Sequence, residues 1–237
     1  MQRYFANKVG ENIILGDGDV HHLLHVMRAK KGDEIEAVAD NKLYACIIES
    51  ISPLVIRTNY EIPTDSELKE DVTLFFALAK GEKIDFVIQK ATELGAGRIV
   101  LLKTERCVVK FEEKNLKHKL ERFEKIAKEA SEQSHRLKMP EIVGVVDIKN
   151  IPQDLLAEVN LIAYEKEAGQ TDSLISHIEK GKSLSVMIGP EGGFSEEEVK
   201  TLVNKYGFVT VSLGKRILRT ETAAVYALSV IGALLEK

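Results

Sequence analysis

Two glycine-bearing runs near the end of the chain contain the residue types that point most directly to chemistry. Residues 188–195 read Ile-Gly-Pro-Glu-Gly-Gly-Phe-Ser, and residues 213–223 read Leu-Gly-Lys-Arg-Ile-Leu-Arg-Thr-Glu-Thr-Ala. Each run follows an apolar stretch that is typical of a buried strand. We therefore expect two turns side by side at the carboxyl edge of one sheet, where open α/β folds bind their ligands.

The residues after the first run limit the kind of ligand. Ser195 is followed by three glutamates, Glu196 to Glu198, and a serine with glutamate three residues later predicts a capping box that opens a helix. A phosphate at this helix start would meet three carboxylates. The lysine of a P-loop and the G-x-G-x-x-G order of a dinucleotide fold are both missing. The turn therefore indicates a ligand without phosphates.

The elements that position these turns form the second part of a two-part chain. Residues 1–70 contain short β-like segments separated by turn signals, which predict a small, mostly β module. From Val72 onward, apolar runs alternate with segments of helical periodicity, which predicts a mostly parallel sheet covered by helices on both faces. Polar residues 64–69 mark the boundary. Strands are expected at 3–6, 12–15, 34–39, 42–49, 54–60, 72–79, 98–103, 142–146, 161–164, 184–188 and 208–213.

The expected helices cover this sheet and end the chain. A long charged helix is predicted over residues 114–136, and a capped helix over 196–206. The last helix, 223–235, is apolar almost all round, so its own sheet can cover only one side and a second subunit could cover the other. Shorter helices are expected near residues 84–94 and 173–179.

Composition excludes several classes of protein. The 237 residues are 44% hydrophobic and 30% charged, and no stretch approaches the roughly 20 apolar residues that span a bilayer. No signal peptide precedes the first module, so a cytoplasmic protein with no membrane partner is expected. The two cysteines, Cys46 and Cys107, lack C-x-x-C spacing and favour buried structural thiols.

Local charge is more informative than the net charge of −4. Residues 103–138 contain eleven Lys and Arg against seven Asp and Glu, whereas residues 1–70 contain eight basic and twelve acidic side chains. A basic stretch could follow a phosphate backbone, although charged runs on helices are usually solvated faces. Both interpretations stay open. The candidate RNA contacts are Arg3, Arg28, Lys30, Arg106, Lys117, Lys119 and Lys125.

Both glycine-bearing runs, together with several separated segments, resemble the knotted S-adenosylmethionine-dependent RNA methyltransferases. Within that superfamily, often called SPOUT, they resemble the bacterial 16S ribosomal RNA uridine N3-methyltransferase family. The other matching segments are Arg3-Tyr-Phe5, residues 21–32, Gln89-Lys-Ala-Thr-Glu-Leu-Gly95, Arg106-Cys107 and Glu129-Ala-Ser-Glu-Gln-Ser-His-Arg136.

The resemblance covers nearly the whole chain and implies a fold and partners. Residues 1–70 would form a PUA-like β-barrel that binds RNA, and residues 71–237 an α/β methyltransferase domain whose C-terminal segment threads through a loop as a trefoil knot. The protein would be a homodimer with its cofactor pocket at the subunit contact, acting on 16S rRNA or the small ribosomal subunit.

The resemblance also implies a cofactor site. Binding S-adenosylmethionine requires close backbone approach, which glycines permit, and an apolar slot for the adenine. The residues implied to bind it are Tyr164, Glu165, Ile188, Gly189, Pro190, Glu191, Gly192, Gly193, Leu213, Gly214, Ile217, Leu218, Arg219 and Thr222.

Methylation of uracil at N3 requires loss of the N3 proton or stabilisation of the resulting anion. An arginine near a uracil carbonyl could stabilise that anion, and a carboxylate within hydrogen-bond reach could accept the proton. Two couples fit these roles: Arg219 with Glu221, and Glu132 with Arg136 one helical turn apart. The alternative for the first is a loop ion pair or dimer contact, and for the second an ordinary helical ion pair. Which carboxylate is the base stays open.

Other interpretations are possible. His21 and His25 have i,i+4 spacing, but H-E-x-x-H and a third ligand are missing, so no metal is expected. A non-catalytic ribosome-assembly protein of this fold is one alternative, and a transfer RNA methyltransferase of this fold is another. The retained GPEGG turn and Arg219 favour an enzyme, and the N-terminal module with the Glu-Gln-Ser-His-Arg segment favours a ribosomal substrate.

Overall fold

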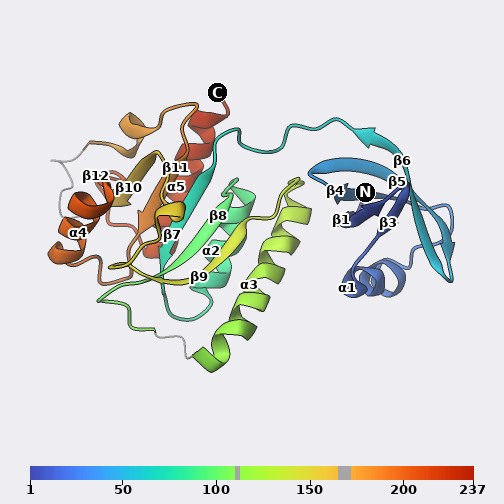
Figure 1. The fold of residues 1–237 in the computed structure, drawn as a ribbon, viewed down its shortest axis with the longest axis horizontal. Helices are drawn as coiled ribbons and strands as arrows, with labels where there is room; N and C mark the ends of the chain where they lie inside the picture. Colours follow the sequence, from blue (N-terminus) through green and yellow to red (C-terminus); the bar gives the residue numbers. More distant parts are fainter. Residues whose placement is uncertain (110–112, 165–171) are drawn as a thin grey trace. The chain divides into compact units, whose positions relative to one another are not determined.

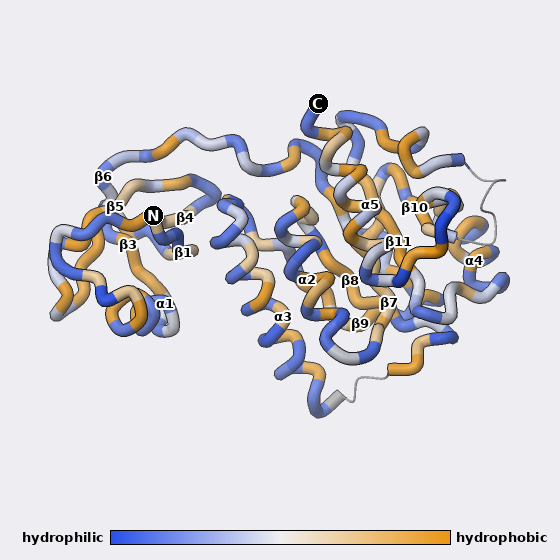
Figure 2. The backbone as a smooth tube through the Cα atoms, turned by 180° about the vertical axis from the view of Figure 1, so that it is seen from behind, coloured by the Kyte–Doolittle hydropathy of each residue, from blue (hydrophilic) through white to orange (hydrophobic). Residues whose placement is uncertain are grey.

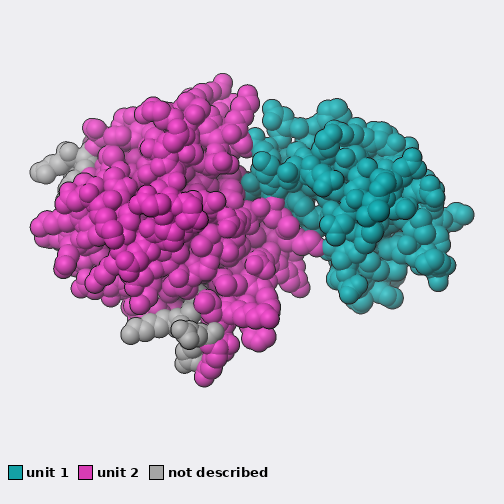
Figure 3. All heavy atoms as spheres, in the orientation of Figure 1, with its two compact units in different colours: residues 1–67, 131–138 teal, residues 68–130, 139–237 magenta. Residues whose placement is uncertain are grey.

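The computed structural model describes residues 1–109, 113–164 and 172–237. The chain divides into two compact units, which are shown in different colours in Figure 3. Unit 1 comprises residues 1–67 and 131–138, and unit 2 comprises residues 68–130 and 139–237. The sequence places the boundary near residue 70 and does not anticipate that a segment from the middle of the chain joins the first unit.

Unit 1 is built on a six-stranded mixed sheet in the order β1-β4-β5-β6-β3-β2. β1 and β4 are parallel and the other pairs are antiparallel. A short helix, α1 (Asp17–His21), runs directly into a π-helical turn at His22–Val26. The strands are β1 (Arg3–Phe5), β2 (Asn7–Val9), β3 (Asn12–Ile14), β4 (Glu34–Ala39), β5 (Lys42–Ile51) and β6 (Leu54–Ile62).

The long helix α3 (Glu113–Gln133) is shorter than its charge pattern predicts. His135 adopts a left-handed φ of 63°, and the Arg136 amide donates to the Ser131 carbonyl at 2.9 Å. This wide bond is the hydrogen-bond pattern that closes a helix C-terminus. The expected helix over 114–136 is therefore too long at its end, and Arg136 lies outside it.

Unit 2 contains the parallel sheet that the alternating pattern predicts. Its order is β12-β10-β11-β7-β8-β9, and every neighbouring pair is parallel. Figure 2 shows the apolar character of its central strands. The strands are β7 (Val72–Ala77), β8 (Arg98–Lys103), β9 (Glu141–Asp147), β10 (Val159–Ala163), β11 (Leu184–Ile188) and β12 (Val209–Val211).

Both faces of this sheet are buried, as predicted. In β7, Leu74 and Phe76 belong to one apolar cluster and Phe75 to another. Because side chains alternate along a strand, the two clusters lie on opposite faces. Helices α2 (Lys83–Glu93), α3 and α5 (Thr220–Leu235) contribute to the first cluster, and α4 (Glu196–Tyr206) to the second (Figure 1).

The ends of these helices bear on the site. Ser195 caps α4 in the predicted capping box, in which Glu198 bonds back to the Ser195 amide at 2.9 Å. The helix expected near 173–179 is a single 3-10 turn, Leu174–His177, and a second 3-10 turn spans Gln153–Leu155. Throughout the described residues, every helix falls short of the length and apolarity that crossing a bilayer requires. The threading of the chain as a knot stays a prediction.

Candidate functional site

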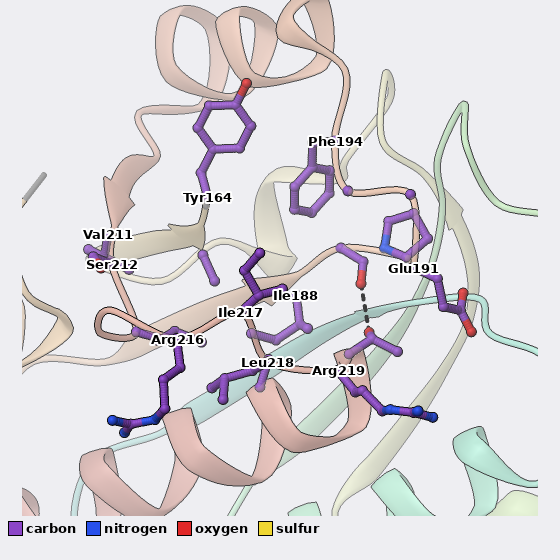
Figure 4. Close-up of a pocket in the computed structure, with 18 of the residues that line it drawn as sticks. Tyr164, Ile188, Glu191, Phe194, Val211, Ser212, Arg216, Ile217, Leu218 and Arg219 are labelled. Atoms are coloured by element: carbon purple, nitrogen blue, oxygen red, sulfur yellow. Dashed lines mark hydrogen bonds between the residues drawn. The ribbon is translucent and has the colours of Figure 1, made fainter. Parts of the chain in front are cut away.

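A pocket of about 420 Å³ opens at the carboxyl ends of β10, β11 and β12 (Figure 4). A volume of this size is within the range of small-molecule sites. Its lining belongs entirely to unit 2. The residues around it are Lys83, Arg106, Ala163, Tyr164, Ile188, Gly189, Pro190, Glu191, Gly192, Gly193, Phe194, Val211, Ser212, Leu213, Gly214, Lys215, Arg216, Ile217, Leu218, Arg219, Thr220 and Ala223.

The turn that follows β11 forms one wall. The Gly193 amide donates to the Pro190 carbonyl at 2.8 Å, and Gly193 has a φ of 65°, a left-handed value that favours glycine. A Cβ on Gly189 would lie 2.9 Å from the Phe194 ring. Glycine at these two positions therefore permits both the bend of the turn and the close packing of Phe194.

The loop that follows β12 forms the facing wall. The Gly214 amide donates to Ser212 Oγ at 3.1 Å, and Gly214 has a φ of 108°. Ile217 is 86% exposed although it is aliphatic, and Figure 4 shows it near Ile188 inside the pocket. Exposed apolar surface in a cavity is typical of a site that a ligand covers.

The two turns meet at one pocket although their strands are not neighbours. β10 lies between β11 and β12, and Tyr164 follows the end of β10. The start of α5 joins the turns, because Thr220 Oγ1 donates to the Gly189 carbonyl at 2.7 Å, the dashed line in Figure 4. The expectation of two turns at one sheet edge is confirmed, with one strand between them.

Arg106 lines this pocket. Its Nη1 atom donates to the Gly192 carbonyl at 2.9 Å, and a Cβ on Gly192 would lie 3.3 Å from the Arg106 Cβ. The neighbouring Glu105 amide donates to Glu198 Oε1 at 2.7 Å. The loop after β8 thus supports the GPEGG turn from one side.

An ion-pair cluster supports the same turn from α2. Lys83 Nζ lies 2.8 Å from Glu191 Oε1 and 3.3 Å from Glu221 Oε2. The hydrogen bond to Glu191 raises the pKa of Lys83. Partial burial opposes ionisation of Glu191, but the hydrogen bond and charge of Lys83 together lower the pKa of Glu191. Both groups therefore stay ionised at neutral pH.

Comparison with known families identifies the chain. A model described as an RNA methyltransferase domain matches residues 66–232, which is more than half of the sequence, and an RNA methyltransferase PUA domain matches residues 15–54. The chain belongs to the RNA methyltransferase family. This confirms the family predicted from the two glycine-bearing runs, and the match at residues 15–54 supports a PUA-like first module.

Individual relatives of this family agree with that assignment. The chain is 39% identical to ribosomal RNA small subunit methyltransferase E of Bacillus subtilis, covering 98% of this chain and 96% of the relative. A putative methyltransferase from Legionella pneumophila, solved with S-adenosylmethionine, superposes with a TM-score of 0.88 at 30% identity. The superposition covers 99% of this chain and 98% of the Legionella protein.

A third similar protein is ribosomal RNA small subunit methyltransferase E from Neisseria gonorrhoeae, solved with bound S-adenosylmethionine. Its TM-score is 0.86 at 29% identity, covering 99% of this chain and 98% of that structure. The RNA methyltransferase fold therefore extends over both units of the chain.

Most residues predicted to bind the cofactor line the pocket. Two do not join this group. Glu165 lies outside the described residues, and Thr222 is exposed on α5 without lining the pocket. Thr220 and Ala223 line the pocket instead. They are three residues apart and therefore share one face of α5, which Thr222 does not.

The two predicted catalytic couples are in different situations. Arg219 lines the pocket, and Glu221 lies behind it, beside Lys83. Glu132 and Arg136 belong to unit 1. Glu132 Oε1 accepts from the Phe5 amide at 3.2 Å, and Arg136 Nη2 donates to Glu67 Oε2 at 2.7 Å. The expected helical spacing is wrong, because α3 ends before Arg136, whereas a catalytic role for Glu132 and Arg136 stays a prediction.

The predicted RNA contacts also separate. Arg3 is only 5% exposed, and its guanidinium binds Glu36 and the His135 carbonyl, so it stabilises unit 1 from within. Arg106 lies in the pocket wall. The remaining predicted contacts are on the surface or close to it: Arg28, Lys30, Lys117, Lys119 and Lys125.

Several pocket residues were not predicted from the sequence, and Lys83, Phe194 and Ser212 are three of them. Lys83 precedes the GPEGG turn by more than a hundred positions, so no local pattern joins them. Phe194 could have been found, because it lies within the same run. Ser212 directly precedes Leu213 and could have been included with it.

Proposed function

We propose that this protein is an S-adenosylmethionine-dependent methyltransferase that methylates N3 of a uridine in 16S ribosomal RNA. One observation carries the proposal: the glycine turns after β11 and β12 enclose one pocket that Arg219 borders. Relatives named as small-subunit ribosomal RNA methyltransferases, similar over nearly the full chain, support the substrate.

The residues of the pocket fit S-adenosylmethionine. Ile188, Leu213 and Leu218 supply apolar walls for an adenine, and the glycines let the backbone approach the ribose and the amino-acid tail. Among the described lining residues, Glu191 is the acidic one, and a helix start rich in carboxylates suits a ligand without phosphates. When bound, this cofactor supplies an electrophilic methyl group.

The residues of the chain would supply the rest of the chemistry. The Arg219 guanidinium would stabilise the anion that forms when uracil N3 loses its proton. Glu221 is the carboxylate nearest to it in sequence, but its Oε2 atom lies 3.3 Å from Lys83 Nζ, and Glu221 is not among the described residues that line the pocket. Arg219 is therefore our primary catalytic candidate.

A homodimer is part of the proposal. On α5 the residues that face outward include Tyr226, which is 38% exposed, with Thr222 and Ser229, while the opposite side is buried in the sheet. Phe86 on the neighbouring α2 is also exposed. The partly exposed aromatic rings of Tyr226 and Phe86, on two helices that pack together, support a second copy of the chain as their cover.

The RNA would be held by exposed basic residues of both units. Arg28 and Lys30 lie on the turn after the π-helical segment of unit 1, and Lys117 and Lys125 lie on α3. Contacts of this kind give affinity through phosphate charge instead of base identity. The base itself would be selected at the pocket.

Mapping ribosomal RNA by mass spectrometry in cells that lack the protein tests the substrate. We expect one uridine of 16S rRNA to lose a methyl group, and the wild-type gene to restore it. A complete methylation pattern in 16S rRNA would overturn the proposal. A methyl group missing from transfer RNA instead would favour the same enzyme class with a different substrate.

A matched pair of glycine variants tests the pocket. Gly193 and Gly207 both have left-handed φ values, 65° and 70°, but only Gly193 is in the pocket wall. Valine at either site introduces backbone strain. We expect Gly193→Val to abolish S-adenosylmethionine binding in calorimetry and Gly207→Val to preserve it. Equal affinity in the two variants would place the ligand elsewhere.

A further inference from the structure

Lys83 joins three separate parts of unit 2 at the pocket. It is the first residue of α2, Glu191 is in the turn after β11, and Glu221 is in the first turn of α5. Its ammonium lies 2.8 Å from one carboxylate and 3.3 Å from the other. All three side chains are partly shielded from solvent, so the pairing is stronger than that of a fully exposed ion pair.

The position of Lys83 is unfavourable for its own helix. A cation in the first turn opposes the helix dipole, whereas Glu221 in the first turn of α5 complements it. A residue that breaks a local rule is expected where tertiary contacts or function compensate for it. The two carboxylates supply that compensation here.

The two carboxylates depend on the ammonium between them. Glu221 Oε2 is buried and makes no hydrogen bond of normal geometry, so the Lys83 charge is its nearest compensation. Without the ammonium, Glu191 and Glu221 would repel each other across the joint between turn and helix. This repulsion would act against the Thr220–Gly189 hydrogen bond, which joins the same turn to the start of α5.

The segments joined by Lys83 border the pocket on two sides. Glu191 is itself in the pocket wall, and Glu221 follows Arg219 and Thr220, both of which line the pocket. Thr220 also holds the Gly189 carbonyl at 2.7 Å. A change in the distance between Glu191 and Glu221 would therefore change the separation of the two walls.

We propose that Lys83 is a positioning residue that fixes the width of the cofactor pocket by joining Glu191 to Glu221. The inference rests on the proposed function in one respect, that the ligand of this pocket is S-adenosylmethionine. Lys83 is itself one of the residues around the pocket, but in this proposal its effect on the ligand passes through the two carboxylates.

A thermodynamic cycle tests this role by calorimetry of S-adenosylmethionine with the full chain. We expect Lys83→Met to raise the Kd about tenfold or more, since small displacements of a binding group have large effects. Lys83→Arg, which keeps the charge, should recover most of the affinity. In the Glu191→Gln/Glu221→Gln background, adding Lys83→Met should change the Kd by less than about twofold, because the groups it acts through are already neutral.

Lys90→Met is the matched control. Lys90 is on the same helix and pairs with Glu93 at 2.8 Å, but it does not line the pocket. We expect its Kd to equal that of the wild type. If Lys83→Met does not fold, Glu191→Gln alone tests the same joint, and we expect it to raise the Kd.

Three results would overturn the inference. They are an unchanged Kd in Lys83→Met, an unchanged Kd in a folded Glu191→Gln protein, and an equal loss from Lys83→Met in the double-glutamine background. The last would mean that Lys83 contacts the ligand directly. A wild-type protein that binds no S-adenosylmethionine overturns both proposals, whereas a complete methylation pattern in 16S rRNA overturns the substrate alone and leaves the cycle interpretable.

Discussion

Two arginines, one in each unit, have the same chemistry and opposite surroundings. Arg136 in unit 1 is 4% exposed, and its guanidinium donates to the Glu67 carboxylate through Nε and Nη2. Arg219 in unit 2 is exposed at the rim of the pocket, where Figure 4 shows its side chain directed away from Arg216. Arg136 stabilises unit 1 through its buried ion pair, whereas Arg219 is accessible to a ligand in the pocket. Burial and partners distinguish these roles where residue type does not.

The largest expected effect concerns the buried arginine. Arg136→Met removes one partner of a buried ion pair and leaves the Glu67 carboxylate with the Leu137 and Lys138 amides as its donors. We expect the free energy of unfolding to fall by about 3 kcal/mol or more. Urea denaturation measures it. Arg122→Met is the control, because Arg122 pairs with Asp85 on the surface and its loss should cost less than about 1 kcal/mol. Equal losses would contradict the distinction between the two arginines.

The exposed arginine should show the reverse pattern. Arg219→Ala should lower kcat about 100-fold, the typical effect of losing one group that stabilises a developing anion. Its urea denaturation curve should match that of the wild type. Assays of methyl transfer to 16S rRNA measure kcat, and urea denaturation of the same preparation measures stability. A variant that loses stability and keeps kcat would make Arg219 a structural residue like Arg136.

A smaller effect is expected on the exposed face of α3. Among the residues that the structure describes, Lys117 and Lys125 pair at 3.9 and 3.8 Å with glutamates one turn away on the same helix. Replacing Lys117, Lys119 and Lys125 with glutamate should weaken RNA binding about tenfold at low salt, because phosphate contacts are lost. Affinity for S-adenosylmethionine should not change. The same charge change at Lys180, Lys182 and Lys200 is the control, and an equal loss there would indicate a general charge effect.

The smallest expected effect is spectroscopic and concerns unit 1. Burial raises the pKa of the Tyr4 phenol to about 12, with further contributions from Asp19 and Glu132. Tyr4 also shares a hydrogen bond with His22 at 2.9 Å. Because the folded pKa exceeds the unfolded one, the stability that Tyr4 contributes is complete below the unfolded pKa and is lost as pH rises toward 12. Ultraviolet titration should find one late-ionising tyrosine that is absent in Tyr4→Phe. An early titration of all tyrosines would indicate that this polar network is open.

Strong local signals made most of the fold predictable. The strand at 98–103 and the helix at 196–206 match their expected bounds, because a continuous apolar run and a capping box mark them. β2 was missed because two of its three residues are exposed and only Val9 is apolar. The end of α3 was missed because His135, and not glycine, adopts the left-handed conformation there.

The site was predictable wherever its residues follow one another in sequence. The two glycine-bearing runs contain most of the pocket wall, so finding them finds the pocket. Other contacts join segments that are far apart in the chain. They include the positions of Lys83 and Arg106 in the pocket wall and the ion pair of Arg136 with Glu67. Their roles arise from tertiary packing, for which a single sequence carries no periodic or capping signal.

The excursion of residues 131–138 into unit 1 has a practical consequence for dissecting the protein. A fragment that ends at residue 70 would lack two hydrogen-bond acceptors of unit 1. They are the His135 carbonyl, which accepts from Arg3, and the Glu132 carboxylate, which accepts from the Phe5 amide. The complementary fragment would carry Arg136 without Glu67. Proteolysis in the 63–67 linker should therefore give a nicked protein whose two pieces co-elute, and each piece expressed alone should be less stable than its counterpart in the intact chain.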